Sequence, residues 1–293
     1  MAASDLLQGA PAHPHRRERV ARLVAQVLPH VVLLAYTLVA LFPVLLTVLN
    51  SLKSRRAIFG TPYLPPTPET FDLVGYQTVA ARAAFQTYFF NSLVVTLVSL
   101  VLILLFGAMA AFALSEYHFP GNALLGLYLS VGIMIPIRLG TVSILELIAG
   151  LGLVNTLAGL ILVYVAQGLP MAIFILRQFM LQVPGEMKQA ARIDGASEYR
   201  IFAMVLPLVR PALGAISIFT MIPIWNDLWF PLILAPDGRT ATVTLGVQQF
   251  LGQFVSDWNA VLAALTLAIL PVLAMYLVFS RQLMRGLTAG SVK

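Results

Sequence analysis

The sequence predicts an all-α protein that crosses a membrane six times, and three observations support this fold class. First, 59% of the 293 residues are hydrophobic and only 10% are charged. A soluble domain carries about 25% charged residues, so this chain has too few to cover a surface in water. Second, the apolar residues form long runs of helical length. Third, these runs lack the strict alternation that is typical of a membrane β-barrel.

The same composition excludes several classes of protein. A soluble globular enzyme, a nucleic-acid-binding protein and a disordered chain all need more charged surface than this sequence provides. The net charge of +6 fits Lys and Arg residues that anchor membrane loops on the cytoplasmic side. The chain contains no Cys, which excludes disulfides and thiolate metal sites.

The expected helices follow from the distribution of charged residues. A bilayer core of about 30 Å needs about 20 mostly apolar residues per helix. Stretches free of Asp, Glu, Lys and Arg cover 23–52, 83–115, 117–137, 147–176 and 258–280, and the stretch 211–236 contains a single Asp. We therefore expect membrane helices at 27–49, 88–112, 123–142, 156–176, 212–233 and 259–281.

Local features refine these elements in chain order. The first apolar run is too long for the hydrophobic region of a signal peptide, so we expect this helix to remain in the mature protein. The following loop, 50–87, is rich in Pro and predicts a small extracytoplasmic cap. Gly107 and the nearby Ala residues of the second helix allow close helix contact. Proline residues inside the later spans predict kinks at Pro136, Pro170, Pro223 and Pro271.

The Lys and Arg residues predict the orientation, because they are enriched on the cytoplasmic side. With both termini cytoplasmic, that side holds 12 of the 18: Arg16, Arg17, Arg19, Arg22, Arg177, Lys188, Arg192, Arg200, Arg210, Arg281, Arg285 and Lys293. Lys53, Arg55 and Arg56 run against the rule. The chain then divides into a cytoplasmic tail (1–26), a first helix with its outer loop (27–87), a helical core (88–281) and a second cytoplasmic tail (282–293).

No catalytic constellation is visible in the sequence. The zinc-binding HExxH and nucleophile GxSxG patterns are absent, and the four His residues do not cluster. Lys53 precedes a Ser, but it follows Leu52 and not the Gly of a phosphate-binding loop. We therefore expect no catalytic residues, no metal site and no cofactor in this chain. If ATP drives its function, another subunit must bind the nucleotide.

One polar segment, 177–211, interrupts the apolar pattern between the fourth and fifth helices. Pro184 can start a short helix that ends at Asp194-Gly195, and a second short helix fits 197–205. Leu206-Pro207 ends the second one. A low apolar surface is expected from Met187, Ala190, Ala191 and Ile193. Such a helix pair suits either a groove in a partner protein or the surface of the membrane.

A second polar feature, Trp225-Asn226-Asp227, lies inside the fifth expected helix. A carboxylate in the bilayer centre costs about 2.5–3.5 kcal/mol on insertion scales, so Asp227 should face protein or water. It could line a solute pathway, or it could form a structural pair near the outer helix end. The aromatic residues fit either a sugar-stacking surface or an interfacial belt.

The polar segment also carries a family resemblance. The run Gln189-Ala190-Ala191, followed by Asp194-Gly195-Ala196 and then by Leu206-Pro207, resembles the EAA motif. That motif belongs to the inner-membrane permeases of binding-protein-dependent ABC importers. The resemblance implies that these residues, within 184–207, couple the permease to an ATPase. The family usually has Glu where this chain has Gln189, which removes one charge from that contact.

The resemblance extends over most of the chain and indicates the carbohydrate-uptake branch. Asn91-Ser92, the segment 107–122 and Trp225-Asn226-Asp227 are similar to that branch, and 286–293 is similar to the tail of the second permease subunit of maltose-type importers. It implies the type I ABC importer permease fold in a bacterial inner membrane. It also implies a second permease, two ATPase subunits that bind ATP and Mg²⁺, and an extracytoplasmic solute-binding protein. The implied solute is a sugar, an oligosaccharide, a polyol or a glycerol-phosphate-like compound.

A self-contained secondary carrier or channel is the alternative. Such carriers usually need carboxylates inside the membrane for ion coupling. Within the expected spans Asp227 is the main candidate, with Arg138 and Glu146 near helix ends. A co-purifying ATPase would distinguish the two functions.

Overall fold

The computed structural model describes residues 16–81, 83–251 and 257–289, and in these ranges the chain is helical apart from loops and one isolated bridge between Lys53 and Phe71. Four helices are long and apolar enough to span a membrane. They are α1 (Arg16–Ser51), α4 (Ala83–Glu116), α7 (Leu157–Leu181) and α13 (Trp258–Ala289). These helices correspond to the spans expected at 27–49, 88–112, 156–176 and 259–281.

The helix expected at 123–142 is broken at the kink predicted for Pro136, and the bend there is sharp. Helix α5 (Asn122–Met134) ends just before Pro136, and the stretch 137–150 then departs by 87°. That stretch contains the 3₁₀ helix η1 (Ile137–Gly140) and α6 (Thr141–Gly150). Pro136 cannot donate a backbone hydrogen bond, and it forces the preceding residue into an extended conformation.

The expected helix at 212–233 is also interrupted. Helix α10 (Arg210–Asn226) stops at Asp227, and α11 (Trp229–Leu234) starts two residues later. At its other end, α10 meets α9 (Glu198–Val205) at an angle of 74°. The part of the chain that the structure describes therefore offers four spanning helices, or six when each bent pair is one crossing.

Small residues bring α4 and α7 into the most extensive helix pair of the described chain. A Cβ atom added to Gly107 would lie 3.0 Å from that of Ala172, and one added to Gly168 would lie 2.5 Å from the Ile103 side chain. The close contact expected from Gly107 is therefore confirmed. The buried side chains of this pair continue into the core beneath α9.

The loop expected at 50–87 forms a small cap with two short helices, α2 (Arg55–Gly60) and α3 (Val74–Ala81). Lys53 is fully buried inside it and donates to the side chain of Asn50 and to the carbonyl of Thr61. Asn259, at the start of α13, donates to the Lys53 carbonyl. Lys53, one of the exceptions to the charge rule, therefore has a structural role in the cap.

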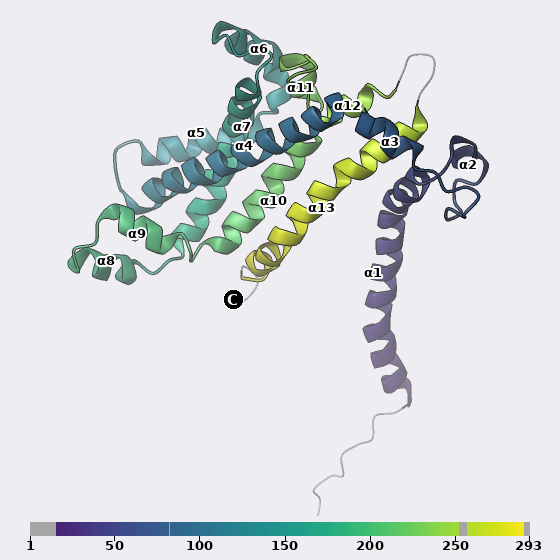
Figure 1. Cartoon of the computed structure of the whole chain (residues 1–293). Helices are drawn as coiled ribbons and strands as arrows, with labels where there is room; N and C mark the ends of the chain where they lie inside the picture. Colours follow the sequence, from purple (N-terminus) through teal and green to yellow (C-terminus); the bar gives the residue numbers. More distant parts are fainter. Residues whose placement is uncertain (1–15, 82, 252–256, 290–293) are drawn as a thin grey trace, which may run out of the picture.

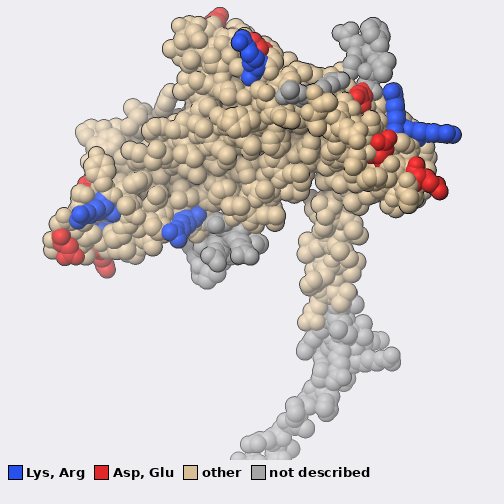
Figure 2. All heavy atoms as spheres, viewed as in Figure 1, with Lys and Arg blue, Asp and Glu red and all other residues tan. Residues whose placement is uncertain are grey.

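Helix α1 diverges from the rest of the body, as Figure 1 shows. Residues 25–45 of α1 are all exposed, although this part of the helix is strongly apolar. Figure 2 shows charged side chains near the margins of the body, with a broad uncharged surface between them. An uncharged surface of this kind is what the apolar core of a bilayer requires of a protein that spans it. Of the expected tails, residues 1–15 and 290–293 lie outside the described residues, and α13 continues as far as Ala289.

Candidate functional site

The polar segment folds as two short helices, α8 (Gly185–Ile193) and α9, as expected. Gly195 joins them with φ of +78°, a conformation that residues with a side chain rarely adopt. Its N–H donates to the Arg192 carbonyl and the N–H of Ala196 donates to the Ala191 carbonyl, which together form a Schellman C-cap. The backbone thus fixes the angle between α8 and α9.

The outward side of this helix pair is exposed and partly apolar. Gln189, Ala190 and the Asp194–Gly195 turn lie on the surface. Ile193 is 86% exposed and Tyr199 on α9 is 83% exposed, which is unusual for large apolar side chains. Exposed apolar patches with polar residues around them are typical of protein or membrane interaction sites. Tyr199 was not expected from the sequence, although its place between the charged residues Glu198 and Arg200 is a signal that could have found it.

The inward side of the pair packs against the transmembrane core. Met187, Ala191 and Ala196 are half-buried and pack against the core cluster, so of the four residues expected to form a low apolar surface only Ala190 and Ile193 are exposed. The inward positions of α8 recur every three to four residues, at Met187 and Lys188 and again at Ala191 and Arg192, because a helix turns by 100° per residue. Ile201 and Val205 anchor α9 and are fully buried.

The end of the segment leads directly into the membrane. Leu206 follows α9 and packs partly against the core, whereas Pro207 is exposed. The carbonyl of Pro207 accepts the N–H of Arg210, where α10 begins. The loop is therefore continuous with a membrane helix through a short connection.

Charged side chains connect the helix pair to the end of α4. Lys188 donates to Glu116 over 2.5 Å, and Arg192 donates to the other oxygen of Glu116 over 2.8 Å. Arg192 also holds Glu198 at 2.8 Å, and the Tyr117 hydroxyl donates to Glu198. The hydrogen bond from Arg192, followed by that from Tyr117, lowers the pKa of Glu198 to about 2. Sequence reasoning missed Glu116 and Tyr117.

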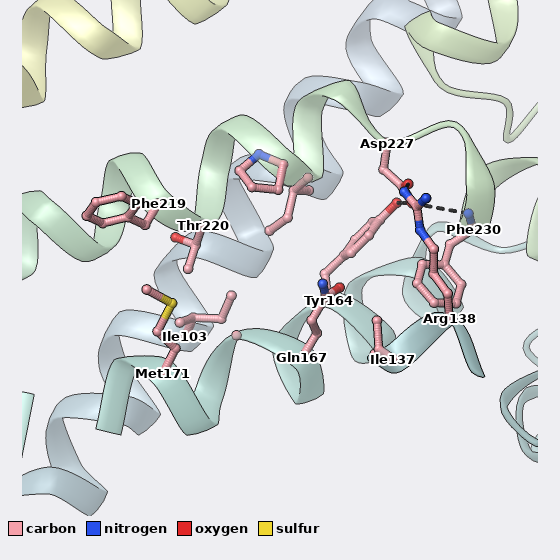
Figure 3. Close-up of a pocket in the computed structure, with 13 residues that line it drawn as sticks. Ile103, Ile137, Arg138, Tyr164, Gln167, Met171, Phe219, Thr220, Asp227 and Phe230 are labelled. Carbon is pink, nitrogen blue, oxygen red and sulfur yellow. Dashed lines mark hydrogen bonds and ion pairs between the residues drawn. The ribbon is translucent and has the colours of Figure 1, made fainter. Parts of the chain in front are cut away.

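A second site lies at the opposite end of α10, around a cavity of about 170 Å³ (Figure 3). Asp227 lines it and accepts hydrogen bonds from the Tyr164 hydroxyl and from the N–H groups of Trp229 and Phe230. Arg138 lies 3.7 Å from the Asp227 carboxylate; its side chain is 68% exposed, against 10% for Asp227. The carboxylate thus connects α7, η1 and the start of α11.

The two residues before Asp227 point elsewhere. Trp225 is buried, donates to the Ala268 carbonyl on α13 and contacts Phe89 edge to face. Asn226 is exposed and donates to a carbonyl of its own helix. Both line a separate hollow against α13. The structure therefore does not gather Trp225, Asn226 and Asp227 around one cavity.

Among the described residues, no group of three or more His, Cys, Asp or Glu side chains could hold a metal ion. The geometry instead combines a rigid exposed helix pair on one side with a cavity between membrane helices, lined by both polar and apolar side chains, on the other. This arrangement suits a protein that transmits motion across a membrane.

Residues 103–288 match the family described as "Binding-protein-dependent transport system inner membrane component". The chain belongs to this family. It is therefore a multi-pass inner-membrane subunit of a bacterial ABC transporter, and not itself an enzyme. Family membership excludes the alternative of a self-contained carrier or channel. Members of the family generally work with a partner permease, an ATPase and a binding protein.

Relatives cover almost the whole chain. The diacetylchitobiose uptake system permease protein NgcG of Streptomyces coelicolor is 33% identical over 267 residues, which is 90% of this chain and 88% of the relative. The arabinooligosaccharides transport system permease protein AraQ of Bacillus subtilis is 30% identical over 261 residues, with 88% and 92% covered.

A solved structure confirms the expected permease fold. A chain from a bacterial ABC transporter involved in the import of the acidic polysaccharide alginate matches with a TM-score of 0.76 and 23% sequence identity. The match covers 93% of this permease and 99% of that chain.

Proposed function

We propose that this permease is one of two membrane subunits of an ATP-driven importer for a sugar, an oligosaccharide or a related polyol. The relatives named for diacetylchitobiose and arabinooligosaccharide uptake support this class of solute, because the permease aligns with nearly their whole length. Glycerol-phosphate-like compounds, which the sequence also led us to expect, stay a prediction. The solute-binding protein outside the membrane selects the solute and delivers it.

The coupling surface is the outward side of α8 and α9. It comprises Gln189, Ala190, Ile193, the Asp194–Gly195 turn and Tyr199, all of them exposed. The single observation that carries this assignment is the exposure of two large apolar side chains on a helix pair with a fixed turn. Apolar anchors surrounded by polar residues are typical of protein interfaces. An ATPase subunit of the importer is the partner that a permease requires on this side.

The importer contains two permeases, two ATPase subunits and one binding protein. Residues 25–45 of α1 are apolar and exposed, and α1 lies apart from the other membrane helices (Figure 1). This uncovered apolar surface supports the presence of a second permease that packs against it. Each permease presents one helix pair, so two ATPase subunits complete the assembly. Helix α1 packs on the second permease along residues 25–45.

Both termini lie in the cytoplasm with the coupling surface. In Figure 1 the start of α1, the end of α13 and the helix pair α8–α9 lie toward one side of the molecule, and α2, α3, α6 and α12 lie toward the other. The excess of Lys and Arg on the first side supports this orientation. The cap of α2 and α3 then faces the binding protein.

The cavity beside Asp227 forms part of the solute pathway. Exposed residues from two helices line it, namely Gln167 of α7 and Pro223 of α10. The amide of Gln167 can both donate to and accept from a sugar hydroxyl. Asp227 uses its oxygen atoms on neighbouring groups of the chain, so it shapes the wall of the pathway.

Reconstitution tests the function as a whole. The permease is placed in lipid vesicles with its partner permease, the ATPase subunits and the binding protein, and uptake of labelled oligosaccharides is measured. We expect uptake only when ATP, the ATPase subunits and the binding protein are all present. Uptake by the permease alone would contradict the proposal. A ligand screen on the binding protein then identifies the solute.

A further inference from the structure

A compact group of charges joins α8 to the last residue of α4. Glu116 is only 10% exposed and Lys188 only 11%, and their side chains are in direct contact. Arg192 occupies the second oxygen of Glu116. A buried carboxylate with two cations is costly to disrupt, because removal of one partner leaves a charge without compensation. This junction is therefore much stiffer than a pair of exposed charges.

The same group of charged side chains also links α8 to α9 across the turn at Gly195. Arg192 on α8 contacts both Glu116 and Glu198 on α9, and Glu198 also accepts the Tyr117 hydroxyl. Aromatic contact between Phe112 and Phe202 adds an apolar link between α4 and α9, with ring centres 5.4 Å apart. The two short helices and the end of α4 thus form one unit.

The opposite end of α4 holds a different loop. Asn91 donates to the carbonyls of Arg239 and Ala241, and the Ser92 hydroxyl accepts the N–H of Val243. These contacts join residues about 150 positions apart and are largely buried. They fasten the loop between α11 and α12 (Val243–Gln248) to α4.

The loop between α11 and α12 is also connected to the cavity beside Asp227. Thr244, at the start of α12, donates to the Asp227 carbonyl over 2.7 Å. The stretch of α4 from Asn91 to Glu116 is about 38 Å long at 1.5 Å per residue, which is enough to cross the bilayer core. A rigid secondary element of this length can carry energetic coupling between two sites that both contact it.

We propose that α4 is the lever that connects the coupling surface to the outer loop 237–244, with Glu116, Lys188 and Arg192 as positioning residues at its inner end and Asn91 and Ser92 at its outer end. The proposal rests on the proposed function, since it assumes that an ATPase displaces α8 and α9. It assigns a role to Asn91-Ser92, which has no contact with the coupling surface or the cavity.

The experiment measures the accessibility of the outer loop 237–244 while the charged contacts at the inner end of α4 are altered. The chain has no native Cys, so Arg239→Cys provides a single thiol on a side chain that is 91% exposed. The complete importer is assembled in vesicles, and the rate of maleimide labelling from outside is compared with and without a non-hydrolysable ATP analogue. We expect the analogue to change this rate in the Arg239→Cys protein.

Glu116→Gln should then reduce the nucleotide-dependent change roughly tenfold, which is within the usual range of coupling between sites. ATPase subunits should still co-purify, because the outward surface is unaltered. Arg200→Gln is the matched control, since Arg200 is an exposed cation on α9 without an ion pair among the described residues, and it should preserve the change. Lys188→Met tests the same junction if Glu116→Gln fails to insert.

Three results would contradict the proposal that α4 acts as a lever. One is a nucleotide-dependent change that persists in full in Glu116→Gln or Lys188→Met. Another is loss of the ATPase subunits from these variants, because the charges would then act on docking. The third is a constant labelling rate in the Arg239→Cys importer that still transports its solute. Failure of ATP-dependent uptake in the unmodified importer would instead contradict the proposed function.

Discussion

Tyr164 on α7 donates a hydrogen bond of 2.8 Å to the carboxylate of Asp227, which lies 63 residues further along the chain. Asp227 occupies the break between α10 and α11 and accepts two backbone N–H groups of α11. The Tyr164 contact therefore fixes the break against a membrane helix and gives the cavity one of its walls (Figure 3).

We expect Tyr164→Phe to lower the stability of the permease by about 1.5–3 kcal/mol, the range for a hydrogen bond to a charged group. Thermal unfolding in detergent measures the effect. Tyr128→Phe is the control, because Tyr128 is exposed on α5. Equal unfolding temperatures for the two variants would show that the contact contributes nothing to stability.

Asp227→Asn should destabilise the start of α11 without changing the apparent KM for uptake. An Asn side chain has one acceptor oxygen, so one of the N–H groups of Trp229 and Phe230 loses its partner, at a cost of about 1–3 kcal/mol. Glu146→Gln, at an exposed position of α6, serves as the control. A raised KM at normal abundance would argue that Asp227 contacts the solute directly.

Gly195→Val and Ala190→Trp should leave the permease in the membrane but reduce uptake by roughly tenfold or more, equivalent to about 1.4 kcal/mol. Val at Gly195 strains a backbone with positive φ, although space for a Cβ atom is available there. Trp at Ala190 obstructs the docking surface. Gln189→Ala should do less harm than either, because Gln189 already lacks the charge expected of its family.

The measurement for these coupling variants is uptake in vesicles beside the abundance of the permease. Ala123→Trp adds the same bulk to an exposed position at the start of α5 and should be tolerated. Near-normal uptake by Ala190→Trp at normal abundance would contradict the assignment of the coupling surface.

Topology can be tested with single cysteines, again because the native chain has none. A thiol at Glu69 in the cap should react with an impermeant maleimide only from outside, and one at Tyr199 on α9 only from the cytoplasm. Both positions are exposed. The reverse pattern would overturn the orientation drawn from Lys and Arg.

The length and hydropathy of a helix are local properties, and the sequence predicted them well. The spans of α1, α4, α7 and α13 follow from apolar runs long enough to cross a bilayer. The turn at Gly195 was also predictable, since Gly is the residue that adopts positive φ without strain. Pro136 gave a local signal for a kink, but not for a bend of 87°.

The sequence by itself determined the class of protein, its family and the two short helices of the polar segment, because each depends on residues close together in the chain. Only the tertiary structure decided that Met187 and Ala191 face inward, and that Trp225 and Asp227 serve different neighbours. It alone joined Lys188 to Glu116 across 72 residues. Contacts of this kind depend on how helices pack in three dimensions, and a charged residue near a helix end does not reveal its distant partner.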